Sequence, residues 1–161
     1  MNVDAAVVVV TGPPASGKTT LARAIAAALG WPLYTKDDFK ELLFDSLGTG
    51  DLEWSTQLGS AAFELLALVL RTAREPLVVE ANFRRLELDR PAVQVFCTGA
   101  ADALNERYRS RTGRHPGHLD DVRTIDPDDY APLPLAGPLI EYSVGSRSLD
   151  DVVAAVRRAL G

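Results

Sequence analysis

The sequence predicts an α/β fold in which a parallel sheet is covered by helices on both faces. Three observations lead to this fold class: continuous apolar runs, amphipathic segments that alternate with them, and a glycine-rich stretch after the first run. Residues 5–10 are continuously apolar, which is typical of a strand buried on both faces. Such strands, alternating with helices, form a parallel sheet between two helical layers.

The boundaries of the first elements follow from their end signals. After the glycine-rich stretch, apolar residues at helical spacing predict a helix that ends at Gly30, where glycine permits the left-handed cap. Residues 32–35 predict a short second strand. The spacing of Asp38 and Glu41 fits a capping box, so the next helix is expected from Asp38 to about residue 47.

The remaining elements continue the alternation. They are expected, in chain order, as a helix at 53–74, strands at 76–81 and 92–97, a helix at 101–110, a strand at 139–144 and a helix at 148–160. Only residues 83–91 separate the third and fourth strands, which is short for a crossover helix. Either one turn of helix joins them or the strand boundaries differ. Residues 120–138, rich in Asp and Pro, are expected to cross the surface as a loop.

Length and composition limit the classes of function. A chain of 161 residues suffices for one domain with a full core, and we expect a single domain over 1–161. The net charge of −5 provides no overall basic field for nucleic acid or membrane. The single cysteine, Cys97, lies in an apolar run and is expected to be a buried thiol in a reducing compartment. With no secretory signal or membrane span in the sequence, we expect a cytoplasmic protein.

Residues 12–19, GPPASGKT, match the P-loop pattern G-x-x-x-x-G-K-[ST] at every fixed position. In this motif backbone N–H groups surround the phosphates at a helix N-terminus, the lysine reaches the β- and γ-phosphates, and the hydroxyl binds Mg²⁺. A buried strand before the loop and a helix after it provide the required context. We therefore expect ATP and Mg²⁺ to bind here, with Thr19 as a metal ligand. The expected nucleotide contacts are Gly12, Pro13, Pro14, Ala15, Ser16, Gly17, Lys18, Thr19 and Thr20.

Other sequence features exclude several classes of nucleotide-binding protein. The sequence lacks the N-K-x-D string with which GTPases read their base. Motor and AAA-type ATPases use longer chains with partner domains. A small phosphotransferase or an ATP-dependent switch remains.

The stretch YTKDDFKELL places two aspartates directly after the second strand, where a carboxylate can reach a substrate hydroxyl. Asp38 is expected to be the helix N-cap, which leaves Asp37 to face the γ-phosphate. Asp37 would then act as the general base or orient the attacking hydroxyl in a loose transition state. Which of the two aspartates is the base stays open at this point.

A second carboxylate, Glu80, ends the third strand in VVEANFRR and can hold a magnesium-bound water or a substrate group. Burial of a glutamate without a partner would be costly, which favours a function. Asn82 and Arg84, just beyond it, are candidate substrate contacts, although either could be an ordinary loop residue.

Basic residues gather in the second half of the chain. Seven of the fourteen arginines fall between Arg84 and Arg114, and arginines beside a transferring phosphoryl group stabilise its charge. Arg107 and Arg111 are spaced to share a helix face. The loop that follows holds two histidines but no third ligand, so residues 111–120 are interpreted as a hinged lid rather than a metal site.

The P-loop together with KDDFKELL, VVEANF and ERYRSRTGRHPGH resembles the small P-loop kinase group. This group includes the kinase domain of phage polynucleotide kinase, chloramphenicol phosphotransferase, gluconate kinase and zeta toxins. The sequence is most similar to uncharacterised bacterial ATP-binding proteins of the group, over about residues 3–118. The resemblance implies a P-loop NTPase fold: a three-layer α/β/α arrangement with five parallel strands in the order 2-3-1-4-5 and a mobile lid.

The resemblance also implies roles for individual residues. The catalytic base maps to Asp37, the lid arginine to Arg111 and an adenine-stacking arginine to Arg107. Polynucleotide kinases place an arginine where this sequence has Lys40, and lysine cannot make the same bidentate contact.

These observations predict an ATP- and Mg²⁺-dependent kinase acting on a hydroxyl of a small molecule such as an antibiotic, sugar or nucleoside. In this interpretation Lys18 and Arg111 neutralise the phosphoryl group and Asp37 activates the acceptor, which also contacts Lys40, Glu80, Asn82 and Arg84. Two alternatives stay open: a 5′-hydroxyl polynucleotide kinase and a non-enzymatic ATP-binding regulator. The acidic stretch 120–134 could bind a cationic substrate or could simply be solvated.

Overall fold

The computed structural model describes residues 5–119 and 123–161, and its centre is a sheet of five parallel strands. The strands lie in the order β2-β3-β1-β4-β5, as the family resemblance implied. They are β1 (Val7–Thr11), β2 (Leu33–Thr35), β3 (Leu77–Glu80), β4 (Val93–Thr98) and β5 (Leu139–Ser143). The helices are α1 (Lys18–Leu29), α2 (Lys36–Leu47), α3 (Leu52–Thr72), α4 (Ala101–Arg109) and α5 (Leu149–Leu160), with a short 3-10 turn η2 (Pro127–Asp129).

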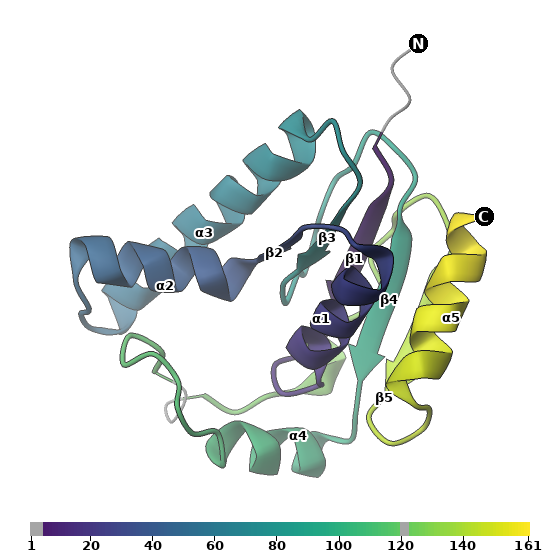
Figure 1. Ribbon diagram of the computed structural model, residues 1–161. Coiled ribbons are helices and arrows are strands. Elements are labelled where there is room, and N and C mark those ends of the chain that lie inside the picture. Colours follow the sequence, from purple (N-terminus) through teal and green to yellow (C-terminus); the bar gives the residue numbers. More distant parts are fainter. Residues whose placement is uncertain (1–4, 120–122) are drawn as a thin grey trace.

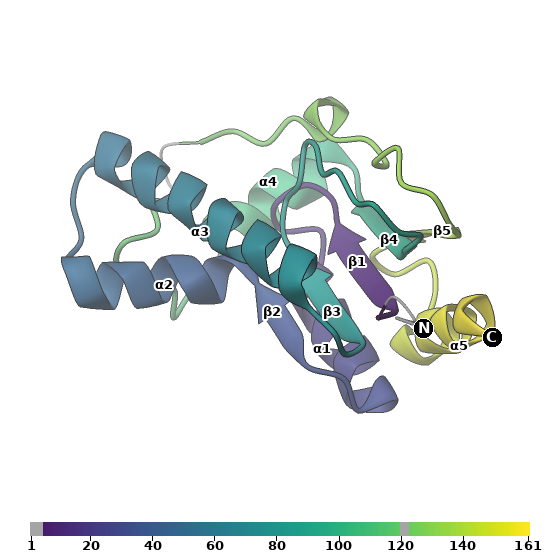
Figure 2. The ribbon, with the colours of Figure 1, turned by 90° about the horizontal axis from the view of Figure 1, so that it is seen from above.

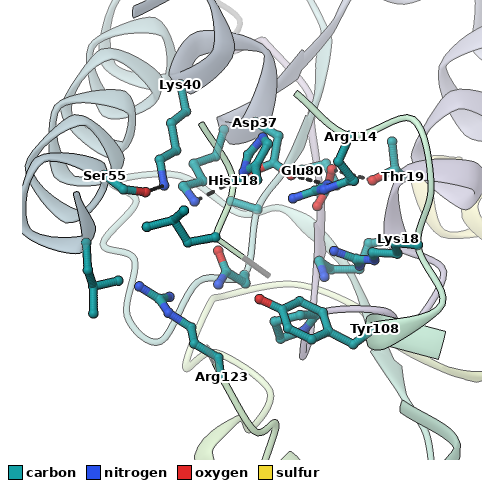
Figure 3. Close-up of a pocket in the computed structure, with 17 residues that line it drawn as sticks. Lys18, Thr19, Asp37, Lys40, Ser55, Glu80, Tyr108, Arg114, His118 and Arg123 are labelled. Atoms are coloured by element: carbon teal, nitrogen blue, oxygen red, sulfur yellow. Dashed lines mark hydrogen bonds and ion pairs between the residues drawn. The ribbon is translucent and has the colours of Figure 1, made fainter. Parts of the chain in front are cut away.

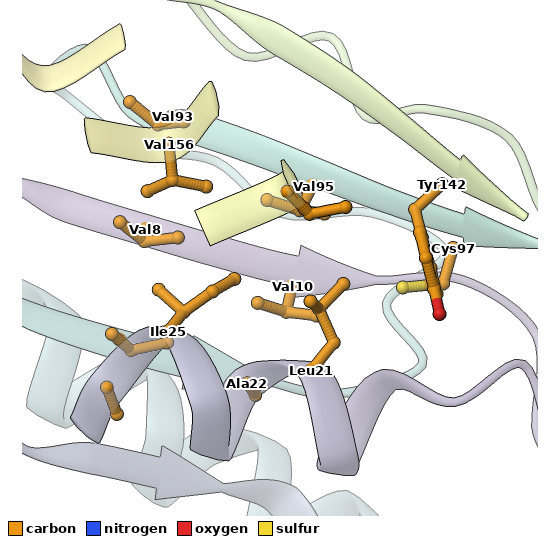
Figure 4. Close-up of a cluster of buried hydrophobic side chains, with 13 residues drawn as sticks. Val8, Val10, Leu21, Ala22, Ile25, Val93, Val95, Cys97, Tyr142 and Val156 are labelled. Atoms are coloured by element: carbon orange, nitrogen blue, oxygen red, sulfur yellow. The ribbon is translucent and has the colours of Figure 1, made fainter. Parts of the chain in front are cut away.

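Helices cover both faces of the sheet, and Figure 2 shows α1 and α5 on one side and α3 on the other. Alternate residues of β1 pack against the helices on opposite faces of the sheet, because successive side chains of a strand point to opposite faces. Val8 and Val10 pack with Leu21 and Ile25 of α1 and with Val156 of α5 (Figure 4). The predicted three-layer α/β/α architecture is therefore confirmed.

The opposite face of β1 packs against α3. Val7 and Val9 contact Leu66 and Leu70 of that helix, and all four side chains are buried. The helical hairpin of α2 and α3 extends beyond the edge of the sheet (Figure 1). Residues of α2, α3 and α4 line one pocket together with Glu80 at the end of β3.

Two local predictions were wrong or incomplete. The helix predicted to start at Asp38 starts at Lys36, and its cap is Thr35, whose hydroxyl accepts a hydrogen bond from the Asp38 N–H at 2.9 Å. The connection from β3 to β4 contains no helix in residues 81–92. Because β3 and β4 lie two strand spacings apart, about 10 Å, an extended loop of this length can cross without one.

The aperiodic segment after α4 is fixed at two points, although residues 120–122 of the predicted loop lie outside the described ones. The Asn105 side chain bonds both the N–H and the carbonyl of Ile125, and Gln94 bonds both backbone groups of Leu133. Cys97 is fully buried, as predicted. Throughout residues 5–119 and 123–161, none of the helices has the length and apolar character needed to cross a membrane.

Candidate active site

The carboxyl ends of three strands meet at one edge of the sheet and supply one site. Residues Val10 of β1 and Thr35 of β2 both lie opposite Glu80 of β3 in the strand register. The P-loop, the start of α2 and Glu80 therefore emerge side by side. Ligands of open α/β sheets bind at such strand ends.

The P-loop backbone has an unusual conformation at three positions. Gly12, Ala15 and Gly17 have φ angles of 137°, 63° and 85°, and Ala15 is the one non-glycine residue with positive φ in the described chain. A Cβ on Gly12 would overlap the backbone of Cys97 in β4, so only glycine lets the loop leave β1 so close to its neighbour. Strained backbone at Ala15 is a feature that proteins retain at ligand sites.

Polar side chains of the P-loop are held inside it. Lys18 Nζ and Ser16 Oγ each donate to the Pro13 carbonyl oxygen at 2.7 Å. Burial lowers the pKa of Lys18, and the nearby Glu80 carboxylate opposes that shift. An ammonium group held in a buried loop with only partial compensation is suited to bind a phosphate.

Thr19 and Glu80 are linked directly. The Thr19 hydroxyl donates to Glu80 Oε2 at 3.1 Å. Burial raises the pKa of Glu80, although Lys18 and the Thr19 bond oppose the shift. Thr19 lies in the first turn of α1 and Glu80 at the end of β3, so the structure brings together the two residues for which the sequence predicted a role at magnesium. That role stays a prediction.

Asp37 lies in the first turn of α2 and faces the pocket, whereas Asp38 is not among its lining residues. Asp37 pairs with Arg114 at 3.2 Å and with Lys36 at 3.6 Å. Burial would raise the pKa of Asp37, but the charges of Lys36, His118 and Arg114 outweigh it and lower the pKa to about 2. Asp37 is therefore ionised at neutral pH and is a weak base.

Lys40 lies one turn further along α2, at the junction with α3. Its ammonium donates to the Ser55 hydroxyl at 2.8 Å and lies 5.2 Å from the centre of the Phe44 ring. Burial, reinforced by the charge of Lys36, lowers the pKa of Lys40 to about 8. Figure 3 shows Lys40 and Ser55 at the end of the pocket away from Lys18 and Thr19.

Arg107 and Arg111 lie beside the P-loop. Both line a groove with Gly17 and Thr20 at the start of α1. The Arg111 guanidinium lies 5.0 Å from the centre of the Tyr108 ring. Arg111 also lines the pocket that contains Asp37, so it lies between the groove and that pocket.

The two candidates after β3 have different positions. Asn82 lines the pocket of Asp37 and Lys18. Arg84 lies in a neighbouring depression, paired with Asp129 at 3.3 Å and 5.2 Å from the Tyr130 ring centre. The structure therefore brings Asn82, but not Arg84, next to the other predicted residues.

The loop after α4, described to residue 119, lies against α2 and closes one side of the pocket. The His115 ring stacks on Phe44 with centroids 5.3 Å apart. His118 lies 2.9 Å from a Glu41 oxygen, and Ser55 Oγ donates to the Gly117 carbonyl at 3.3 Å. The two histidines thus attach this loop to α2. Residue 120, the last of the expected lid, lies outside the described residues.

Several lining residues were not singled out from the sequence as site residues, namely Lys36, Ser55, Tyr108, His118 and Arg123. Lys36 could have been found, because it lies between the second strand and the predicted base, Asp37. The others come from α3, α4 and the segment beyond, and only the tertiary fold brings them to the strand ends.

Comparison with known proteins assigns this chain to a family. A family model for an AAA domain matches residues 7–114, about two thirds of the chain. The chain belongs to this AAA domain family, so the sequence-based exclusion of AAA-type proteins by chain length was wrong for this family. A comparison with curated proteins found no match.

Solved structures that resemble this chain include three kinases. A putative kinase from Chloroflexus aurantiacus is 36% identical, with a TM-score of 0.83 over 98% of this chain and 100% of that one. A gluconokinase from Sinorhizobium meliloti shares 24% identity and a TM-score of 0.55, over 98% of this chain and 92% of that one. A shikimate kinase from Aquifex aeolicus shares 15% identity and a TM-score of 0.55, over 96% and 95% of the two chains. The fold is thus that of small P-loop kinases.

The donor set fits a magnesium ion that is bound together with nucleotide. Mg²⁺ prefers oxygen ligands and keeps several waters, using one or two protein groups beside substrate phosphates. The Thr19–Glu80 pair provides such groups. Within the described residues no three His, Cys, Asp or Glu side chains form a cluster that could hold a metal by themselves.

Proposed function

We propose that this protein is an ATP- and Mg²⁺-dependent phosphotransferase that moves the γ-phosphate of ATP to a hydroxyl group of a small molecule. The observation that carries the proposal is that Asp37 lines one pocket with Lys18 and Thr19 of the P-loop. A carboxylate facing the phosphate-binding loop is suited to position an attacking hydroxyl. The family and the similar solved structures support the same reaction class.

Each residue of the nucleotide end has a proposed role. The backbone of residues 12–20 surrounds the phosphates, and Lys18 and Arg111 neutralise the charge that spreads over the transferring group. Arg107 lies at the outer groove, where it can stack on the base. Thr19, and Glu80 by way of a water, would hold Mg²⁺, which would supply charge neutralisation at the phosphates.

Transfer forms a bond from the acceptor oxygen to the γ-phosphorus while the bond to the β–γ bridging oxygen breaks. ADP leaves with the electron pair, and the acceptor proton passes to the Asp37 carboxylate. Because the pKa of Asp37 is about 2, this group mainly orients the hydroxyl and accepts the proton late. Such timing suits a loose transition state, in which the nucleophile needs little activation.

The rest of the pocket would receive the acceptor. Lys40 and Asn82 line it directly, whereas Arg84 would take part only if the acceptor extends into the neighbouring depression. We further propose that the chain is one kinase domain and that residues 111–119 cover the bound substrates as a lid. A cytoplasmic location would suit the free, buried Cys97.

The test is transfer of label from γ-labelled ATP with Mg²⁺ to a panel of hydroxyl compounds and one oligonucleotide. We expect label on a small acceptor. Asp37→Asn should lower kcat by about 100-fold or more, the usual contribution of a positioned acid–base group, while the Kd for ATP stays within threefold. Equal loss of transfer and of ATP binding would contradict the role of Asp37. Label on the oligonucleotide would identify a polynucleotide kinase, and tight ATP binding without transfer would favour a regulator.

A further inference from the structure

The acceptor end of the pocket is strongly basic. Of the described residues around the pocket, six are lysines or arginines and two are carboxylates, although the whole chain carries a net charge of −5. Lys18 and Arg111 belong to the nucleotide end. The other four are Lys36, Lys40, Arg114 and Arg123. Figure 3 shows Lys40 and Arg123 on the side away from Lys18.

Lys40 has only neutral direct partners in the described part of the chain. The residue is 6% exposed, and its ammonium donates a hydrogen bond to the Ser55 hydroxyl and lies near the Phe44 ring. No carboxylate of the described residues lies within 4 Å of the ammonium. A buried charge without an opposite charge is costly, and proteins retain such groups where a ligand supplies the counter-charge.

The nearest carboxylate of the pocket does not neutralise this end. Asp37 is already paired with Arg114 and Lys36 at 3.2 and 3.6 Å, so its charge is shared between those cations. Arg123 is exposed and makes no ion pair with another described residue. Two cations from opposite walls of the pocket, Lys40 and Arg123, are therefore available to one anion.

We propose that the acceptor is a small hydroxyl compound carrying an anionic group, a carboxylate or a phosphate, which Lys40 and Arg123 bind. The inference rests on the proposed phosphotransferase function and deepens it. Asp37 lies between the anion-binding end and the P-loop in Figure 3, so an acceptor anchored by its anion would present its hydroxyl at Asp37. The side-chain amide of Asn82, which also lines the pocket, can donate a further hydrogen bond to the same compound.

The test compares acceptors in matched pairs that differ in charge: gluconate with sorbitol, glycerate with glycerol, and ribose 5-phosphate with ribose. Transfer of label from γ-labelled ATP is measured for each. We expect kcat/KM at least ten times higher for one anionic member than for its neutral partner. The carboxylate and phosphate pairs distinguish the two sources of the anion.

Variants test the residues that bind the anion. Lys40→Met keeps the approximate length of the side chain and removes its charge. Because a charge-assisted hydrogen bond to the acceptor is lost, kcat/KM for the anionic acceptor should fall by roughly 10- to 100-fold, chiefly through a higher KM. The neutral partner should change by less than threefold. Because Arg123 is exposed, Arg123→Gln tests the proposed anion-binding role without disturbing the core. Arg71→Met, on the exposed end of α3, is the control and should behave as wild type.

The outcomes separate this inference from the proposed function. Transfer to neutral acceptors as fast as to anionic ones, or equal effects of Lys40→Met on both, would overturn the inference and leave the phosphotransferase standing. If no compound accepts label, calorimetry measures how tightly each member of the same pairs binds to the protein. The protein is first loaded with Mg²⁺ and a non-hydrolysable ATP analogue. Anion binding weakened by both Lys40→Met and Arg123→Gln would support the assignment, and absent or charge-independent binding would refute it.

Discussion

Alanine at position 12 is expected to destabilise the protein and displace the nucleotide-binding loop. Gly12 has a φ angle of +137°, a conformation that side chains rarely adopt. An added Cβ would lie 2.9 Å from the carbonyl carbon of Cys97 and closer still to its oxygen. The obstacle is the backbone of a central strand, which cannot rotate away as a side chain could.

The magnitude follows from two separate costs. Backbone strain of this kind costs about 1–3 kcal/mol, and overpacking against a fixed neighbour costs about 1–3 kcal/mol more. Gly12→Ala should therefore cost about 4 kcal/mol of unfolding free energy. Gly30→Ala is the matched control, because Gly30 also has positive φ, +67°, but no heavy atom lies within 4 Å of its added Cβ. Only the left-handed conformation is then penalised, by about 1–2 kcal/mol.

Thermal and urea unfolding followed by circular dichroism measure the difference. At about 2–4 °C per kcal/mol for a chain of this size, Gly12→Ala should lower Tm by roughly 8–16 °C and Gly30→Ala by roughly 2–8 °C. At a temperature where both variants are folded, only Gly12→Ala should weaken ATP binding. Equal loss of Tm in the two variants would refute the argument, since the contact with Cys97 would then contribute nothing.

Two further predictions concern the cations of the pocket. Lys18→Met should weaken ATP binding by at least about 100-fold, measured by calorimetry, because charged contacts of this kind contribute several kcal/mol. The Tm of the nucleotide-free variant should be unchanged or higher, because a buried ammonium is removed; a large fall in Tm would show that Lys18 supports the fold. The KM for an anionic acceptor should rise as pH increases past about 8, because Lys40 loses its proton there and no longer attracts the anion. Lys40→Met should abolish that rise, and a rise that persists in the variant would assign it to another group.

The sequence predicts the parts of the site that depend on local chemistry. Continuous valine runs mark the buried strands, and the P-loop pattern fixes where the phosphates bind. Because parallel strands present their carboxyl ends at one edge, the positions of Asp37 and Glu80 after their strands suffice to assign both to the same site. The Thr19–Glu80 contact agrees with that assignment.

Local rules fail where two residues compete for the same position. Thr35 and Asp38 are both good cap residues, and the capping-box spacing favoured Asp38. The structure uses Thr35 because β2 passes directly into α2 without a connecting loop. The difference moves Asp37 and Asp38 together into the first helical turn, where their side chains point in different directions.

The acceptor end could not be predicted because its contacts are far apart in the chain. Asp37 and Arg114 are separated by 77 residues, and the Ser55 hydroxyl meets the carbonyl of Gly117 across 62. No periodicity or motif encodes such pairs. They depend on how the α2–α3 hairpin is placed relative to α4, which is a property of the packed fold.

The chain as a whole is negatively charged, whereas its pocket is lined mainly by basic residues. This contrast distinguishes a polynucleotide acceptor from a small anionic one. A polynucleotide would extend beyond the pocket, over a protein that carries a net charge of −5, and would meet repulsion along its length. A small anion would be enclosed among Lys40, Arg123 and Ser55, where short-range attraction in a partly buried site outweighs the screened field of the distant surface. The same arrangement would exclude neutral compounds, since they leave the buried Lys40 ammonium without a counter-charge. The electrostatics of this chain therefore support the proposal that the acceptor is both small and negatively charged.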